Sequence, residues 1–548
     1  MNTTAGVELS VIVATHNRRE LLRRCLKSLT EQTQDPASFE VIVADDGSED
    51  GTAEMAESLD TPHALKVLHL AKSGKVGALN AAIEEMAGSV CLFLDDDIVA
   101  SPGLVAAHLT AHREEPKALG IGALTQSPPA GRDWFGRAHA KSWNERYDGL
   151  ASRQPDWPDC YGGNFSAPRE SLRKVGGFAS DLEAIEDIEL GYRLCEAGCR
   201  PLYLSEARGI HDDQKSRNRI LADMSRFGSF CAEFVERLPA TRSKLLGWFL
   251  DTTPREVMLR RLLLTLRVEP RTIAPLGALV PGVGRRQIWF GFVSRYAFWR
   301  GARAAMSRKR WLQTTRGVPV LMYHAFTDSG ERDRYVLSSR SFARQMRLLS
   351  LLRRRVISFD ELAGSLREGQ PLPPRAVVLT IDDGYRDNFE LAYPILRRHR
   401  FPATIFLVSQ RLGAHNDWGD KGAVAGRPIL AIDQVKQMAA DGIRFGAHTR
   451  SHCRLPEADD GALVDQIDGS REDLEAALGG PIETFAYPYG RYDERAVASV
   501  GEAGFAAACT IEGGLAKLDD DPFLVPRIEV RGSDSTVRLL GKIWLGRT

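Results

Sequence analysis

The chain has 548 residues, of which 72 are Lys or Arg and 72 are Asp or Glu, so its formal net charge is zero. A chain of this length is expected to form about two to four domains. A hydrophobic fraction of 43% with 26% charged residues is typical of soluble globular proteins. The balanced charge shows no overall excess of basic residues that would favour nucleic-acid binding, so we expect no nucleic-acid partner.

Cysteine usage and hydropathy predict a location inside the cell. The eight cysteines are scattered without a Cys-x-x-Cys pair, as is typical of a reducing compartment. Met1–Gly6 lacks the basic and apolar regions of a signal peptide, and no stretch approaches the roughly 18–20 apolar residues of a membrane span. We therefore expect a cytoplasmic protein, with a peripheral position at the inner face of the membrane left open.

Strands and helices are predicted to alternate through the first part of the chain. Apolar runs predict strands that begin at Leu9, Phe39, Leu65 and Val90, and a helix is expected over about Glu20–Thr30. This alternation predicts an α/β fold with a parallel, doubly wound sheet, in which ligands bind at the carboxyl ends of the strands.

Acidic residues follow two of these strands, at the edge where a ligand would bind. Asp95 and Asp97 flank one turn residue, so both can face an Mg²⁺ or Mn²⁺ ion that neutralises a diphosphate. Asp45 or Asp46 is placed to accept a hydrogen bond from a nucleotide base or ribose, and the sequence leaves open which of them does so. A lone Asp-x-Asp is most often a solvated loop, but the apolar run before it and the second acidic turn favour a binding site.

These motifs resemble those of the family-2 glycosyltransferases, which have a GT-A fold, over about residues 9–212. The matching segments are Thr15–Arg18, Asp45–Ser48, Gly74–Lys75, Leu79–Asn80, Asp95–Asp97, Gly162–Asn164, Val175–Phe178, Glu186–Arg193 and His211. The resemblance implies nucleotide-sugar contacts at Thr15, Asn17, Asp45, Asp46, Lys75, Asn80 and Asp96. It implies that Mn²⁺ or Mg²⁺ binds at Asp95, Asp97 and His211, with contact to the diphosphate as the alternative for His211.

The resemblance also assigns a catalytic pair. Asp187 is implied to be the base that deprotonates the acceptor hydroxyl in an inverting transfer, and Glu186 is implied to assist it. By itself this pair would be interpreted as the acidic first turn of a helix, which is the alternative. The Gln-x-x-Arg-Trp motif of processive members is missing after His211, so the addition of a single sugar is expected.

A basic and aromatic segment follows. Residues 255–316 contain fourteen Lys or Arg but only two acids, with Trp, Phe and Tyr interleaved. We predict one amphipathic helix over 285–310 that lies on an anionic membrane surface. The alternative is a helical bridge whose aromatic side chains pack against one or both domains. The Pro/Gly-rich stretch 275–284 is predicted to be a loop.

The last part of the chain places two acids and two histidines after predicted strands. The run 377–385 is a strand that ends in Asp382 and Asp383, and a shorter strand precedes His448 and His452. One Asp with two His leaves coordination positions open, as in a catalytic zinc site. The turn at Tyr487–Gly490 can aim a backbone N–H at a developing oxyanion. Each fragment alone could equally be a loop of a stable barrel.

These three motifs resemble those of the polysaccharide deacetylases, the NodB-homology domain of carbohydrate esterase family 4, over about residues 318–546. The resemblance implies a distorted (β/α) barrel that binds Zn²⁺ or another divalent transition metal. It implies that Asp382 is the general base, that Asp383, His448 and His452 bind the metal, and that the Tyr489 N–H donates to the oxyanion.

Two departures from the family pattern matter. Ala486 stands where an Arg often opens the third motif, and the usual C-terminal Leu-x-His is missing. The chain instead carries a Tyr-His pair ending at His324 and a Pro-Arg-Ile segment around Arg527. We assign His324 as general acid or substrate contact, with a structural role as the alternative, and Arg527 as the partner of Asp382.

Together, these features predict a bifunctional enzyme. The expected domains are a glycosyltransferase over 1–235, a helical connector over 236–316 and a deacetylase over 317–548. The first would transfer an N-acetylhexosamine from a UDP-linked donor to a glycan, lipid-linked or protein acceptor, and the second would remove its acetyl group. Two alternatives stay open: one domain is only a binding module, or the two sites act on different residues of one glycan.

Overall fold

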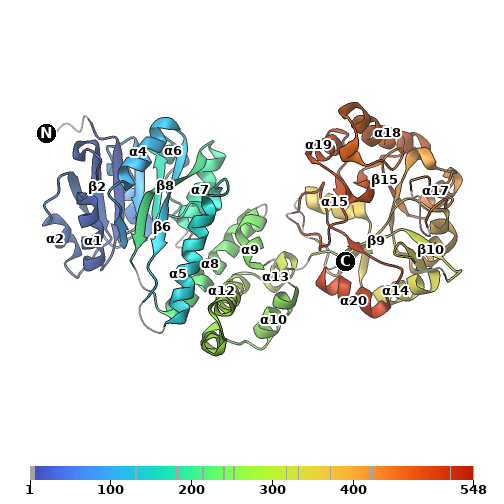
Figure 1. Cartoon of the computed structure of the whole chain (residues 1–548), viewed down its shortest axis with the longest axis horizontal. Helices are drawn as coiled ribbons and strands as arrows, with labels where there is room; N and C mark the ends of the chain where they lie inside the picture. Colours follow the sequence, from blue (N-terminus) through green and yellow to red (C-terminus); the bar gives the residue numbers. More distant parts are fainter. Residues whose placement is uncertain are drawn as a thin grey trace. The chain divides into compact units, whose positions relative to one another are not determined.

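The chain forms two compact units. The computed structural model describes residues 6–129, 133–180, 185–212, 215–238, 241–250, 254–315, 317–330, 333–368, 370, 372–418, 424–518 and 520–546. Unit 1 consists of residues 1–236, 244–250 and 256–305, and unit 2 consists of residues 237–243, 251–255 and 306–548. Each unit has its own large β-sheet with helices around it (Figure 1).

Unit 1 is built on an eight-stranded sheet in the order β3-β2-β1-β4-β7-β6-β8-β5. Its strands are β1 (Leu9–Thr15), β2 (Phe39–Asp45), β3 (Ala64–His69), β4 (Val90–Leu94), β5 (Ile98–Ala100), β6 (Ala118–Gln126), β7 (Asn164–Pro168) and β8 (Arg200–His211). The first four are parallel, as predicted, but β7 is antiparallel to β4 and β5 is antiparallel to β8, so the sheet is mixed. The α/β fold class is confirmed.

Helices shield the first strands of this sheet from water. The core of unit 1 joins β1, β2 and β4 to apolar residues of α1 and α3, such as Leu26 and Ile83. All residues of β2 and β4 are buried. Because both faces of these strands are covered, their side chains are mostly apolar and do not alternate regularly with polar ones. The principal helices are α1 (Arg19–Thr30), α2 (Thr52–Glu57), α3 (Gly74–Glu85), α4 (Leu104–Glu114), α5 (Trp134–Leu150), α6 (Arg169–Val175), α7 (Glu186–Glu196) and α8 (Arg217–Arg237).

The basic segment and the residues just before it fold as several helices, most of which belong to unit 1. They are α9 (Trp248–Leu250), α10 (Pro254–Thr265), α11 (Pro270–Ile273), η5 (Ala274–Leu279) and α12 (Val283–Ala305), and α13 (Arg308–Thr315) follows. The prediction of one helix over 285–310 is wrong in its end, because α12 stops at Ala305. The prediction of a loop over 275–284 is also wrong, because η5 continues to Leu279 and α12 already begins at Val283.

The aromatic side chains of α12 pack inside unit 1. Phe290 and Phe292 belong to a cluster with Phe135 of α5 and Ile220 of α8, and Trp299 is buried as well. The Phe135 and Phe290 rings meet edge to face with centroids 4.9 Å apart. The packing alternative is therefore confirmed for these aromatic residues, which do not face lipid.

Unit 2 has a curled sheet of parallel strands, as the deacetylase resemblance predicted. The order is β17-β16-β15-β14-β13-β9-β18, with β12 also paired to β13, and β10 and β11 form a separate pair. The strands are β9 (Val320–Tyr323), β10 (Ala325–Thr327), β11 (Val336–Ser338), β12 (Arg355–Ile357), β13 (Ala376–Ile381), β14 (Thr404–Leu407), β15 (Arg444–Ala447), β16 (Thr484–Ala486), β17 (Ala507–Cys509) and β18 (Ile528–Glu529).

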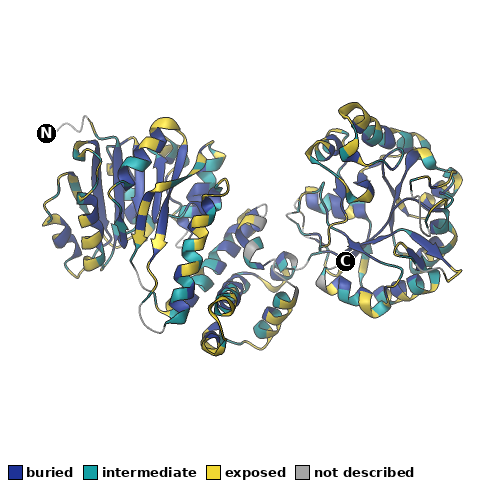
Figure 2. Cartoon of the chain, in the orientation of Figure 1, coloured by how far each residue is buried: buried dark blue, intermediate teal, exposed yellow. Residues whose placement is uncertain are grey.

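Helices surround the outside of this half-barrel (Figure 2). The principal ones are α14 (Ser339–Leu351), α15 (Phe359–Arg367), α16 (Tyr393–His399), α17 (Ile432–Ala440), α18 (Asp460–Leu478), α19 (Glu494–Glu502) and α20 (Thr536–Leu545). Among the described residues of the chain, none of the helices combines the length and apolar character needed to cross a bilayer.

Two glycines allow α8 and α12 to cross with their backbones in contact. A Cβ atom at Gly301 would lie 1.7 Å from the carbonyl oxygen of Ser225, and one at Gly228 would lie 2.2 Å from that of Phe298. Neither obstacle is a movable side chain, so a larger residue must push the helices apart. Gly291, on the same helix, would meet only the guanidinium of Arg295, at 3.1 Å.

We predict that Gly301→Ala destabilises unit 1 and that Gly291→Ala does not. Overpacking at the crossing costs about 1–3 kcal/mol or more, whereas replacing an unobstructed helical glycine by alanine gains about 0.5–1 kcal/mol. Thermal unfolding of the two variants measures the difference. Equal melting temperatures would contradict the close crossing.

Candidate active sites

The first candidate site lies at the carboxyl edge of the unit 1 sheet. Because β1 pairs in parallel with both β2 and β4, Thr15 is aligned with Asp45, and the acids after β4 follow at the same edge. A cavity of about 300 Å³ opens there. It is lined by Ala14, Thr15, His16, Arg18, Asp46, Lys75, Asp95, Asp96, Asp97, His211, Lys215 and Arg219.

Two of the acids after β4 are held by cationic and hydroxyl partners. Thr15 donates to Asp96 at 2.8 Å, and Arg18 bridges Asp96 at 3.1 Å and Asp97 at 2.7 Å. His211 Nε2 lies 3.2 Å from the second carboxylate oxygen of Asp97. Burial raises the pKa of Asp96 to about 7 despite Arg18. Burial acts the same way on Asp97, but His211 and Arg18 outweigh it and lower its pKa.

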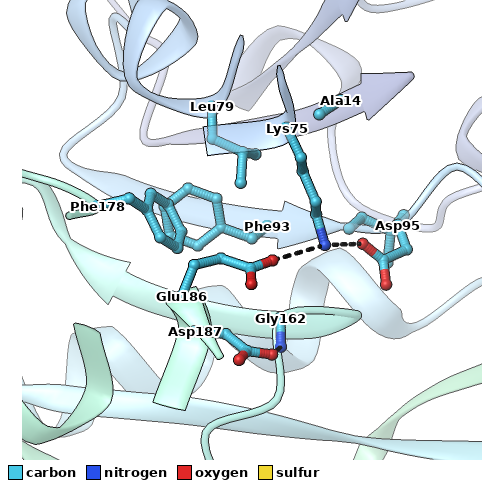
Figure 3. A pocket seen from close by; sticks show the side chains of 10 residues that line it. Ala14, Lys75, Leu79, Phe93, Asp95, Gly162, Phe178, Glu186 and Asp187 are labelled. Atoms are coloured by element: carbon cyan, nitrogen blue, oxygen red, sulfur yellow. Dashed lines mark hydrogen bonds and ion pairs between the residues drawn. The ribbon is translucent and has the colours of Figure 1, made fainter. Parts of the chain in front are cut away.

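The third acid faces a different cation. Lys75 Nζ lies 3.1 Å from Asp95 and 3.2 Å from Glu186, which brings α3, β4 and α7 together (Figure 3). Burial opposes the charge of Lys75, but Asp95 and Glu186 raise its pKa above the ordinary value. Asp95 thus points toward Lys75, whereas Asp97 points toward His211. The three predicted metal ligands do not converge as one group among the described residues.

The predicted base pair sits in the first turn of α7. Asp187 accepts hydrogen bonds from the backbone N–H of Gly162 at 2.6 Å and of Ile188 at 2.8 Å, and Glu186 is buried beside it. Burial, and then the charge of Glu186, raise the pKa of Asp187 to about 7. A carboxylate with that pKa is a better proton acceptor near neutral pH than an exposed aspartate.

The remaining predicted sugar-nucleotide residues differ in their surroundings. Asp46 accepts the backbone N–H groups of Ser73 at 2.6 Å and Gly74 at 3.0 Å, so it caps the start of α3. Asp45 accepts from Ser48 N at 3.1 Å, and Asn17 accepts from Glu49 N at 2.8 Å. These contacts fix the turn after β2.

Asn80 acts away from the cavity wall. Its amide makes two hydrogen bonds of 2.9 Å with the backbone of Phe178, so it ties α3 to the segment before α7. Its neighbour Leu79 lines a second pocket, which shares Lys75 and Asp95 with the cavity, together with Phe93 and Phe178. Asn80 therefore supports the pocket wall by holding the backbone of Phe178.

The second candidate site, at the end of β13, contains a buried ion pair. Arg527 donates to both oxygens of Asp382 at 2.7 Å, and both side chains are buried. Arg527 Nε also donates to the carbonyl of Thr510 at 2.8 Å. Burial alone would raise the pKa of Asp382, but Arg527 outweighs it and lowers the pKa. The predicted partnership of these two residues has the geometry of a bidentate pair.

Asp383, His448 and His452 converge next to this pair. His452 Nε2 lies 3.2 Å and His448 Nε2 lies 3.5 Å from one oxygen of Asp383, and all three side chains are buried. Their candidate ligand atoms lie within 4.8 Å of one another. One carboxylate and two imidazoles are a donor set that suits zinc and related divalent ions, so these residues fit a metal.

The backbone around this group is held in uncommon conformations. Asp383 has φ 71°, His452 has φ 61° and Tyr489 has φ 56°. Such positive values in non-glycine residues cost free energy and cluster at functional sites. They turn the side chains after β13 and β15 toward a common centre.

Surrounding groups orient the imidazoles. His448 Nδ1 hydrogen-bonds to the carbonyl of Ala486 at 2.7 Å, which directs Nε2 toward Asp383. The His452 ring stacks on Trp418 with centroids 4.6 Å apart and meets Tyr489 edge-on at 4.5 Å. Tyr489 in turn donates its hydroxyl to the carbonyl of Trp418 at 3.2 Å.

His324 lies at the rim of this second site. Its Nε2 is 4.0 Å from Asp382, and its ring lies 4.8 Å from that of Tyr335. The position is within reach of a group bound beside Asp382. Its role as acid or substrate contact stays a prediction.

Sequence reasoning gave no role to three groups that the structure places in the sites. Arg18 lies in the Thr15–Arg18 segment, and its spacing from Thr15 is a signal that could have predicted its place in the site. Trp418 lies far from every motif in sequence. The Ala486 contact is made by a backbone carbonyl, which side-chain patterns cannot reveal.

Comparisons with known proteins match both units. The sequence model of glycosyl transferase family 2 matches residues 10–176, and that of polysaccharide deacetylase matches residues 369–508. A Bacillus subtilis (strain 168) protein, YxkH, named provisionally as a polysaccharide deacetylase, is 26% identical over 222 residues, or 40% of this chain and 74% of YxkH.

Two further relatives carry more specific names. Validoxylamine A glucosyltransferase of Streptomyces hygroscopicus subsp. limoneus is 28% identical over 265 residues, or 43% of this chain and 58% of that protein. Poly-beta-1,6-N-acetyl-D-glucosamine N-deacetylase of Staphylococcus aureus (strain MSSA476) is 24% identical over 230 residues, or 40% of this chain and 76% of that protein.

We predict that Arg527→Met destabilises unit 2 by about 3–5 kcal/mol at neutral pH, because Asp382 is left buried without a partner. The pKa of Asp382 is lower in the folded protein than that of an ordinary carboxyl group. The ion pair therefore stabilises the fold fully at pH values above the ordinary carboxyl pKa, and this stabilisation is lost as the pH falls through the lowered pKa of Asp382. The deficit should therefore narrow in acid.

Urea unfolding at several pH values measures this deficit. Arg355→Ala is the matched control, because Arg355 pairs with Glu361 at 2.6 Å on the surface of the same unit and should cost much less. Equal losses for the two variants would refute the importance of the buried pair.

Proposed function

Because the chain joins a glycosyl transferase family 2 domain to a polysaccharide deacetylase domain, we propose that it is a bifunctional enzyme of glycan synthesis. Residues 1–235 would transfer an N-acetylhexosamine from a UDP-linked donor, and residues 317–548 would remove the acetyl group. The observation that carries the proposal is the convergence of Asp383, His448 and His452 beside the Arg527-held Asp382.

In the transferase site, Asp187 would take the proton from the acceptor hydroxyl as that oxygen attacks the sugar. Its raised pKa and its fixed contact with Gly162 suit this role. Mn²⁺ or Mg²⁺ would be held by Asp95, Asp97 and His211, which all line the same cavity. When bound, the ion would supply positive charge for the departing diphosphate. Arg18 and Lys75 would add to that charge.

In the deacetylase site, a divalent metal would be held by Asp383, His448 and His452. When bound, it would polarise the acetyl carbonyl and acidify water. Asp382 is kept ionised by Arg527, so its carboxylate can take the proton of the attacking water. The Tyr489 N–H would donate to the oxyanion, and His324 Nε2 would return a proton to the departing amine.

The names of the relatives support these two classes of activity. A glucosyltransferase and an N-deacetylase of an N-acetylglucosamine polymer are similar to the two parts of this chain. The acceptor would be a glycan, free or lipid-linked, or a protein. Fusion of the two units would raise the effective concentration of the new N-acetyl sugar at the second site.

We predict that the purified chain with Mn²⁺, Zn²⁺ and UDP-N-acetylglucosamine adds one N-acetylhexosamine to an acceptor and then removes one acetyl group. Mass spectrometry over a panel of acceptors measures both steps. Asp383→Ala should keep sugar addition, lose the acetyl release and lower bound zinc, because one of three metal ligands is missing.

Asp97→Ala is the matched variant in the first unit and should abolish sugar addition. If Asp97→Ala still adds the sugar, or if Asp383→Ala still releases the acetyl group, the unit that carries the substitution would be only a binding module. Acetyl release from other residues of the acceptor would show that the two sites act on different sugars.

We predict that sugar transfer slows as pH falls below about 7, by about tenfold per unit, because Asp187 must be ionised to act as base. Asp187→Asn should lower kcat by about 10²–10⁴-fold. Glu186→Gln should shift the acidic limb to lower pH, because the charge of Glu186 raises the pKa of Asp187. An unshifted limb in that variant would contradict this assignment.

A further inference from the structure

Exposed apolar side chains concentrate on one short segment of unit 1. Of the nineteen large apolar side chains that the described residues leave exposed, eight lie between positions 258 and 288. Exposed residues mark α10 and the start of α12 in Figure 2. The eight are Met258, Leu259, Leu262, Leu266, Leu276, Leu279, Val283 and Ile288.

This exposure is not explained by loose packing of the segment. The opposite side of α12 is anchored in a core cluster through Phe290, Val293 and Ala297. In α10, Met258 and Leu262 are four residues apart, so they lie on one face of the helix, and Leu266 continues the spacing. Water-facing positions of a surface helix are normally polar. Exposed apolar residues that gather on one segment instead indicate a binding surface.

The charge of the segment indicates what binds there. Between 255 and 316 the only acids are Glu256 and Glu269. Arg260 pairs with Glu256, and Arg300 pairs with Glu269, both at 2.5 Å. Further arginines remain exposed beside the apolar residues, namely Arg255, Arg267, Arg271 and Arg285. Leucines flanked by exposed arginines are complementary to an anionic lipid surface, whose acyl boundary takes apolar groups and whose headgroups attract cations.

We propose that α10, η5 and the first turns of α12 bind the surface of an anionic membrane. The aliphatic residues enter the headgroup boundary, and the arginines contact acidic headgroups. The aromatic residues of α12 are buried, apart from the half-buried Trp289, so the contact is made by a different set of side chains. None of its residues belongs to either candidate active site. Given the proposed function, the surface would hold the enzyme beside a lipid-borne acceptor.

Vesicle co-sedimentation of the full chain tests the proposal. We expect binding to vesicles of phosphatidylcholine with phosphatidylglycerol and much weaker binding to phosphatidylcholine alone. Leu262→Glu should lower the partition coefficient by about tenfold, and so should Leu279→Glu. Each variant loses one leucine side chain that would otherwise enter the lipid headgroup boundary. Arg271→Glu should lower binding by about fivefold or more, and salt should weaken binding by the wild type.

Leu351→Glu is the matched control, because Leu351 is an equally exposed apolar residue of α14, with 71% of its surface accessible. It should bind as the wild type does. The proposal is overturned by failure of the wild type to bind, by binding that ignores lipid charge, or by unchanged binding of the leucine variants. It is also overturned if Leu262→Glu and Leu279→Glu change only the sedimentation mass of the chain, which would identify an interface between copies.

Discussion

Buried carboxylates require a positive partner, and this constraint shapes both sites. Parallel strands deliver acids to one edge of each sheet, where burial would otherwise force them to take up protons. Arg527 outweighs burial for Asp382, and His211 with Arg18 outweighs it for Asp97, whereas the pKa of Asp96 stays raised. The positive groups therefore determine which acids are ionised and which directions they face.

The two units meet that constraint differently. In unit 2 the cation is an arginine fixed by Thr510 and Asp382, and the adjacent Asp383 converges with two histidines in a group that fits a metal. In unit 1 several acids are engaged by flexible side chains from neighbouring elements, and burial raises the pKa of both Asp96 and Asp187 to about 7. The first arrangement suits a fixed metal, and the second suits a site that rearranges when a nucleotide sugar enters.

The helices of residues 254–305 have two unlike faces. One face packs into unit 1 through aromatic side chains and through the close crossing at Gly228 and Gly301. The other exposes aliphatic residues and arginines. Apolar residues of this segment thus serve both the core of unit 1 and the proposed interaction surface. Which of the two a residue serves depends on the face of the helix on which it lies.

The sequence by itself determined the α/β class, the two families and the residue types at the strand ends. It could do so because period-two and period-3.6 apolar patterns and strand-to-turn motifs are local in the chain.

Tertiary structure decided what depends on long-range contacts. It turned Asp95 toward Lys75, gave Asp46 to the start of α3 and tied Asn80 to Phe178. It also brought Trp418 and the Ala486 carbonyl to the histidines, and buried the aromatic residues of α12. These outcomes follow from which surfaces meet when the elements pack, and no local pattern carries that information.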